Sequence, residues 1–185
     1  IDTVASSITT KGMFFDDEGR AERLVFRDWG VKTFKEIPFN LVDPQNGTKP
    51  NAIMLNGPFG VKAPKMPKQV ELPCRTTAVA IHMLSGVAGW GYPAAEKGST
   101  SMIVRLTYAS GKTEDHKLLN GEHFADYINR VDVPKSEFAF NLSGRQLRYL
   151  SITPNSKEPL EKLELIKGDD VTAPIVMAIT IQTAE

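Results

Sequence analysis

The sequence predicts an all-β protein, an antiparallel β-sandwich. Apolar and polar residues alternate with a period of two over most of the chain, which places neighbouring side chains on opposite faces of a strand. The 14 glycines and 12 prolines lie mostly between the alternating runs, where turn residues are expected. Many short strands separated by such turns are typical of a sandwich or a barrel.

The strands are predicted in chain order from short runs bounded by turn residues. At 101–109 the alternation is clearest, because Met102, Val104, Leu106 and Tyr108 share one face. The turn residues SGKT follow, and the extended run TEDHKLL then predicts a hairpin. The other predicted strands are 23–27, 51–55, 68–72, 77–84, 137–142, 146–153, 161–166 and 174–182.

Residues 1–185 are predicted to form one domain, since this length is sufficient to close a single core. Residues 1–12 are rich in Ser and Thr and are either a linker remnant or a first edge strand. The Pro-rich segment 61–69 is predicted to be an ordered crossing loop, because strands of the same composition continue on both sides. The helical candidate is a single turn within 121–128, GEHFADYI.

The charge balance restricts the partners. Lys plus Arg number 22 and Asp plus Glu number 22, so the formal net charge is zero and nucleic acid or an anionic membrane is not an expected partner. No apolar run approaches the roughly 20 residues that a membrane-spanning helix needs. The chain begins at Ile1, so we expect a processed protein or an excised domain.

Signatures of catalysis are missing from the sequence. There is no G-x-S-x-G, no phosphate-binding G-x-x-x-x-G-K-[ST] and no H-E-x-x-H motif. Cys74, the single cysteine, follows a predicted strand and is expected to be a buried, unreactive thiol. His82 alternates in phase with Leu84 and is expected to be a strand residue of the core. We therefore expect a binding or scaffolding domain and not an enzyme.

Two groups of residues are candidates for metal ligands. His116 and His123 flank a turn with Asp115 and Asp126 close by, but the spacing matches no closed zinc motif and favours a polar loop. Adjacent carboxylates at 16–18 are a candidate calcium loop, although a solvated acidic loop is the favoured interpretation. No cofactor is expected, and a structural calcium ion is the one alternative.

Several segments occur in an order that resembles a known family. They are FKEIPFNLVDP at 34–44, KMPKQVELPC at 65–74, AVAIHMLSGVAGWG at 78–91, the stretch 103–128 and the stretch 148–181. This succession resembles the galactose-binding-domain-like, jelly-roll β-sandwich modules of large secreted bacterial proteins. Such modules include non-catalytic, carbohydrate-binding-like domains of glycoside hydrolases. A closer resemblance is to the C-terminal domain of proteins that also carry propeller-type dehydrogenase and c-type haem modules.

The resemblance covers roughly residues 20–183 and has implications for fold, partners and location. It implies a jelly roll whose ligand contacts come from loops at one end of the sandwich. It also implies a secreted or periplasmic protein, a polysaccharide or glycan as partner, and neighbouring domains in a larger protein. It provides no invariant ligand residue, so the site residues are argued from their chemistry.

The segment SGVAGWGYP at 85–93 contains the main candidate for ligand binding. Trp90 and Tyr92 lie in a glycine-flanked loop after a strand, and aromatic faces pair with the C–H patches of sugar rings. Arg105, Asp115 and His116 are the candidates for hydrogen bonds to sugar hydroxyls. The alternative is that Trp90 caps one end of the sandwich, and Trp29 has the same ambiguity.

Two functions remain open at this point. The first is a non-catalytic carbohydrate-binding module, which an exposed Trp90 beside a groove favours. The second is a structural or docking domain that packs against a catalytic or propeller partner without binding sugar, which an exposed apolar face favours.

Overall fold

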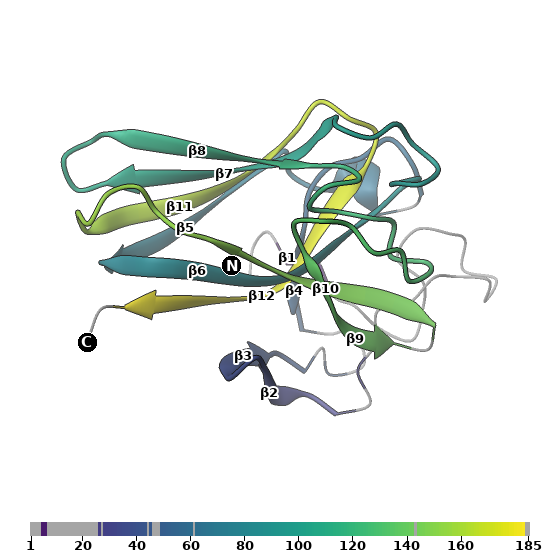
Figure 1. Cartoon of the computed structure of the whole chain (residues 1–185), viewed down its shortest axis with the longest axis horizontal. Helices are drawn as coiled ribbons and strands as arrows, with labels where there is room; N and C mark the ends of the chain where they lie inside the picture. Colours follow the sequence, from purple (N-terminus) through teal and green to yellow (C-terminus); the bar gives the residue numbers. More distant parts are fainter. Residues whose placement is uncertain are drawn as a thin grey trace.

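The computed structural model describes residues 5–6, 26, 28–43, 45, 49–60, 62–142 and 144–183. In this part of the chain the structure is all-β, with antiparallel sheets that pack against each other and no α-helix (Figure 1). The predicted antiparallel β-sandwich is confirmed. A short 3-10 turn, η2 (Ala63–Lys65), lies in the Pro-rich segment. No helix in the described residues is long and apolar enough to cross a membrane.

Three sheets make up the described structure, and all neighbouring strands in them are antiparallel. In spatial order, the six-stranded sheet contains β1 (Ala5–Ser6), β4 (Ala52–Met54), β12 (Ala173–Thr183), β6 (Ala78–Ala88), β10 (Arg145–Ile152) and β9 (Glu137–Leu142). The four-stranded sheet contains β5 (Gln69–Thr76), β11 (Leu160–Lys167), β7 (Thr100–Tyr108) and β8 (Thr113–Leu119). A separate hairpin is formed by β2 (Gly30–Phe34) and β3 (Ile37–Leu41).

Apolar side chains from alternate positions fill the space between the two larger sheets. Met102, Val104 and Leu106 of β7 are fully buried there, on the face that the alternation predicts. Ile81 and Met83 of β6, in the other sheet, belong to the same cluster. The predicted hairpin is also present, because β7 pairs with β8 across the turn at 109–112. The period of two is therefore a reliable signal for the strands that have one face in this core.

The six-stranded sheet has a second core on its other face, between the sheet and the β2–β3 hairpin. Figure 1 shows this hairpin below the sheet. Phe39 and Leu41 of β3 are buried there with Tyr149 of β10, and the ring of Phe34 lies 5.2 Å from that of Tyr149. Residues 81–88 of β6 are consequently buried without interruption. A strand covered on both faces needs no polar side, which is why its sequence is almost continuously apolar.

His82 lies in this second core, as predicted for a strand residue. Its Nδ1 is 2.8 Å from the hydroxyl of Tyr149 and its Nε2 is 3.1 Å from Oε1 of Gln182. The rings of His82 and Tyr149 stack with an interplanar angle of 15°. Both nitrogens of His82 therefore have structural partners.

The structure differs from the sequence-based expectation at two places. The helical turn expected at 121–128 is absent, and the chain there forms turns and isolated bridges from Asn120 to Phe124 and from Asp126 to Val87. The hairpin at 30–41 has no counterpart among the predicted strands. Most of the predicted strand 23–27 lies outside the described residues, as does 1–12 apart from Ala5–Ser6, which pair with β4 at the sheet edge.

Candidate functional site

The loop between β6 and β7 holds Trp90 at the surface. This loop lies at the end of the sandwich where β6 finishes and β7 begins, together with the loops that follow β8 and β11 (Figure 1). The side chain of Trp90 is 56% exposed, so it does not cap the core. Its backbone is in the left-handed region, with φ of 68°, directly after Gly89 with φ of 79°. A bulky non-glycine residue rarely adopts this conformation.

Two buried polar side chains hold the backbone of this loop. The carboxylate of Asp126 accepts a hydrogen bond from the N–H of Gly91 at 2.9 Å, and the amide oxygen of Asn120 accepts one from the N–H of Tyr92 at 2.8 Å. The Asn120 amide also donates to the carbonyl of Glu96 at 2.9 Å. Asn120 is fully buried and Asp126 nearly so. The backbone of the loop is thus hydrogen-bonded to these two buried side chains at Gly91, Tyr92 and Glu96.

Tyr92 turns back towards the protein, unlike Trp90. A Cβ built on Gly121 would lie 3.0 Å from Cδ2 of Tyr92 and 2.8 Å from Cγ of Lys97. The tyrosine ring therefore packs over a glycine that leaves room for it, and it is half-buried. The loop therefore exposes the ring of Trp90 to solvent and packs the ring of Tyr92 against the protein.

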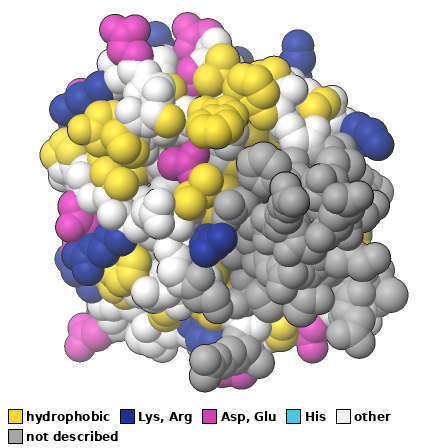
Figure 2. Space-filling model, turned by 90° about the vertical axis from the view of Figure 1, so that its right-hand side faces the viewer, with side chains coloured by type: hydrophobic (Ala, Val, Ile, Leu, Met, Phe, Trp, Pro, Cys, Tyr) yellow, Lys and Arg dark blue, Asp and Glu magenta, His cyan; other side chains and the backbone are white. Residues whose placement is uncertain are grey.

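Phe59 and Val171 lie beside the Trp90 loop, at Gly89. A Cβ built on Gly89 would be 3.7 Å from Cδ2 of Phe59 and 3.3 Å from the carbonyl oxygen of Val171. Phe59 is 42% exposed and Val171 is 43% exposed. We call Phe59, Trp90 and Val171 the end patch. Figure 2 looks at this end of the sandwich and shows hydrophobic side chains gathered in its upper part.

The loop that carries Val171 is also held by a buried carboxylate. Asp170 accepts hydrogen bonds from the hydroxyls of Ser101 at 2.6 Å and Thr172 at 2.7 Å, and it pairs with Lys167 at 3.1 Å. Burial raises the pKa of Asp170, but these partners outweigh it and the pKa ends below its usual value. Of the three loops that form the end patch, those of Trp90 and Val171 are therefore each held by a buried acid.

The structure does not bring Arg105 and Asp115 to Trp90. They pair with each other on the outer face of the four-stranded sheet, through two hydrogen bonds of 2.7 and 2.8 Å. The bonds to Arg105 lower the pKa of Asp115. Arg105 is five residues along β7 from Thr100, where the Trp90 loop ends, which corresponds to roughly 17 Å of strand. This ion pair belongs to a different surface.

His116 is also separate from Trp90, and it does not share a face with Asp115. It is the register partner of Val104, so it points to the inner side of β8, and its Nε2 contacts a carboxylate oxygen of Glu114. Glu114 also accepts a hydrogen bond from the hydroxyl of Tyr108, near the opposite end of the sandwich. Burial, together with this contact, raises the pKa of Tyr108 to about 12. The Tyr108–Glu114 hydrogen bond links the two strands of the β7–β8 hairpin, and the His116–Glu114 contact lies within β8.

The metal-site candidates remain dispersed. His123 Nδ1 accepts a hydrogen bond from the N–H of Leu119 at 3.0 Å, and burial lowers its pKa. Asp126 binds the Trp90 loop instead. Within the described ranges there is no group of three or more His, Cys, Asp or Glu side chains placed to hold a metal ion. The candidate calcium loop at 16–18 lies outside the described residues.

Cys74 and Trp29 both pack against apolar clusters of the protein. Cys74 is partly buried against the core between the sheets, and burial raises the pKa of its thiol. A thiol with a raised pKa is a poor nucleophile. The ring of Trp29 packs 5.7 Å from that of Phe26. Trp29 is therefore a packing residue, in contrast to Trp90.

Sequence reasoning did not predict that Phe59 and Val171 join the site. It also missed that Asn120 and Asp126 hold the Trp90 loop, although Asp126 was a candidate metal ligand. Asp126 comes from the segment 121–128, for which the sequence predicts a helical turn, and Asn120 directly precedes that segment. Phe59 and Val171 come from loops far from Trp90 in the chain. Only the two glycines around Trp90 gave a local signal. Comparisons with protein-family models, with curated proteins and with solved structures found no match.

Proposed function

We propose that this protein is a non-catalytic carbohydrate-binding module that presents Trp90 to a glycan. The observation that carries the proposal is the conformation of Trp90. A large aromatic side chain is held more than half exposed on a left-handed backbone, and a loop clamped by Asn120 and Asp126 keeps it there. Neither the exposure nor the backbone strain stabilises the fold, so a binding role is the reason to retain them.

The end patch has chemistry suited to a sugar ring. Trp90 offers a flat, exposed aromatic face, and Phe59 adds a second partly exposed ring beside Gly89. The axial C–H groups of a hexose pack on such faces, while its hydroxyls stay in contact with water or polar groups. Asp169, two residues before Val171, is exposed and is a candidate acceptor for a sugar hydroxyl. It replaces Arg105, Asp115 and His116 as the polar candidate.

The resemblance to galactose-binding-domain-like jelly rolls is part of the same proposal. Loops at one end of the sandwich are where that resemblance expects ligand contacts, and Trp90 lies in such a loop. A secreted or periplasmic location and neighbouring domains of a larger protein follow from the proposal.

A docking domain without sugar binding is the second candidate. It is favoured by Val171, since an exposed aliphatic side chain next to Trp90 and Phe59 makes the end patch apolar. In that case the partner is an adjoining catalytic or propeller domain. The two candidates differ in whether the isolated protein binds glycans.

Trp90→Ala should weaken glycan binding about ten-fold or more, since an aromatic contact contributes on the order of 1.5 kcal/mol. A glycan array or affinity gel identifies the ligand, and titration calorimetry then compares the variant with the wild type. The melting temperature should stay unchanged, because the side chain is exposed. Val31→Ala is the matched control, since Val31 is 68% exposed on β2 and should affect neither property. A wild-type protein that binds no glycan contradicts the proposal and supports docking.

Trp90→Gly should be more stable than Trp90→Ala by about 1 kcal/mol. Both variants lack the indole, but only glycine adopts a φ of 68° without steric cost. Urea denaturation of the two variants measures the difference. A glycine variant less stable than the alanine variant would show that the backbone at Trp90 is not left-handed.

A further inference from the structure

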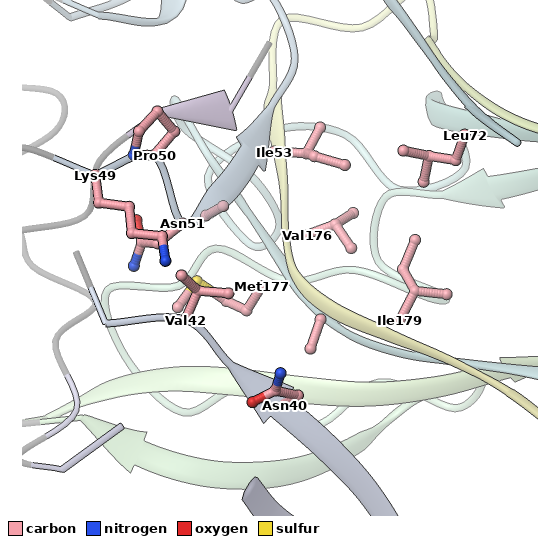
Figure 3. A pocket seen from close by; sticks show the side chains of 12 residues that line it. Asn40, Val42, Lys49, Pro50, Asn51, Ile53, Leu72, Val176, Met177 and Ile179 are labelled. Carbon is pink, nitrogen blue, oxygen red and sulfur yellow. The ribbon is translucent and has the colours of Figure 1, made fainter. Parts of the chain in front are cut away.

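A cavity of about 380 Å³ lies on another part of the molecule, where β4 separates from β12 (Figure 3). β4 pairs with β12 only through Met54 and Ile53. Residues 49–51, which precede β4, are not paired with β12. β12 itself has a register irregularity between Val176 and Ala178. The residues that line the opening are Asn40, Val42, Lys49, Pro50, Asn51, Ala52, Ile53, Leu72, Val176, Met177, Ala178 and Ile179.

One side of this cavity is apolar. Ile53 of β4 and Val176 of β12 come from the six-stranded sheet, and both also belong to the core between the sheets. Leu72 comes from β5 of the other sheet, and Ile179 from farther along β12. Figure 3 shows these four side chains together on one side of the view. Branched aliphatic groups from both sheets therefore line this side of the cavity.

Three of the eight other lining residues are polar, and one of these carries a positive charge. Asn40, Lys49 and Asn51 contribute two amides and one ammonium group, and Figure 3 shows Lys49 and Asn51 on the side opposite Leu72. An anion at this side would meet a cation and amide donors.

We propose that this cavity binds a small organic acid with an apolar body, such as a medium-chain carboxylate. The volume falls within the range of about 300–1,000 Å³ that is typical of small-molecule sites. The aliphatic wall takes the hydrocarbon part, and Lys49 with the amides takes the carboxylate. A sugar does not suit this site, because its hydroxyls would lie unpaired against Ile53, Leu72 and Ile179. The site is separate from the end patch.

Titration calorimetry with octanoate, octanol and octylammonium separates the head group from the tail, since the three ligands share one hydrocarbon chain. We expect octanoate to bind the wild-type protein most tightly and octanol about ten-fold more weakly, because the alcohol lacks the charge-assisted contact. Octylammonium should bind most weakly. No binding of octanoate, or equal binding of all three ligands, overturns the proposal.

Three variants locate the site. Lys49→Met should weaken octanoate binding about ten-fold and leave octanol binding unchanged. Lys117→Met is the matched control, because Lys117 is an exposed lysine on β8 outside the cavity lining, and it should alter neither affinity. Ala178→Phe places a ring in the cavity and should abolish binding of both ligands, with the melting temperature reporting that the variant folds.

Two outcomes with the variants overturn the assignment. Octanoate affinity that is unchanged by Lys49→Met removes the anionic part of the proposal. Unchanged binding by a folded Ala178→Phe variant shows that the ligand binds elsewhere. Trp90→Ala should not affect octanoate binding, so failure here is distinguishable from failure of the glycan-binding proposal.

Discussion

Arg148→Ala should lower the free energy of unfolding by about 3–5 kcal/mol, the largest stability change that we expect from a single side chain here. Arg148 is 1% exposed. Its guanidinium donates to the carbonyl of Val131 at 2.9 Å, and to the carbonyl and the hydroxyl of Ser136 at 2.7 and 2.6 Å. Truncation leaves these acceptors without their donor and opens a cavity beneath the chain at 131–136. Urea denaturation measures the loss.

The planar set of N–H donors on the guanidinium of Arg148 is the reason for this large loss of stability. Burial lowers the pKa of Arg148, with Asp132 at 3.7 Å opposing the shift, and an arginine stays protonated under such conditions. Arg148→Lys should recover only part of the stability, because an ammonium group cannot reproduce the planar set of donors. Arg130→Ala is the control: Arg130 is exposed over the ring of Phe138 and should cost about 1 kcal/mol or less. Similar losses for both alanine variants would contradict the assignment.

Asp126→Ala should cost about 3 kcal/mol of stability and should also weaken binding at the end patch. The carboxylate accepts hydrogen bonds from the N–H groups of Gly91 at 2.9 Å and Ile128 at 3.0 Å. Each N–H left buried without an acceptor costs about 1–3 kcal/mol. The released loop no longer holds Trp90 in one position, so the ligand must order it on binding. Denaturation and titration of the same variant measure the two effects.

Two variants separate the clamp from a general charge effect. Asp126→Asn keeps one oxygen acceptor and should lose about half as much stability as Asp126→Ala. Asp115→Ala removes a partly exposed carboxylate from the Arg105 pair, and such pairs contribute about 0–1 kcal/mol. It should not change binding, because Asp115 lies away from the end patch. An Asp126→Ala variant with wild-type stability would show that Asp126 does not hold the loop.

The fold could be predicted where a strand has one face in the core and one face towards solvent. β7 is the clearest example, since Met102, Val104, Leu106 and Tyr108 alternate with more exposed residues in the sequence and in the structure. The pattern failed to reveal that β6 is covered on both faces, because a continuous apolar run does not indicate what covers it. The β2–β3 hairpin that provides the cover was itself not predicted.

The candidate site was predicted only in part, for a comparable reason. Gly89 and Gly91 mark Trp90 locally, because they are neighbours in sequence and form one turn. Phe59 and Val171 reach Gly89 from loops that are distant in the chain, and no local spacing encodes that approach. Arg105 and Asp115 were placed near Trp90 by their order in the sequence. The register of β7 and β8 instead pairs them on an outer face.

The sequence by itself determined the class of structure and the unusual position of Trp90. Strand alternation and glycine-rich turns are local properties, because side-chain direction and backbone freedom depend on neighbouring residues. Only the tertiary structure decided that Trp90 is displayed while Tyr92 is folded back, and that Asn120 and Asp126 hold the loop between them. These outcomes depend on which distant segments meet at one end of the sandwich. Which segments meet there depends on how the two sheets pack against each other, and it cannot be inferred from any short stretch of the chain.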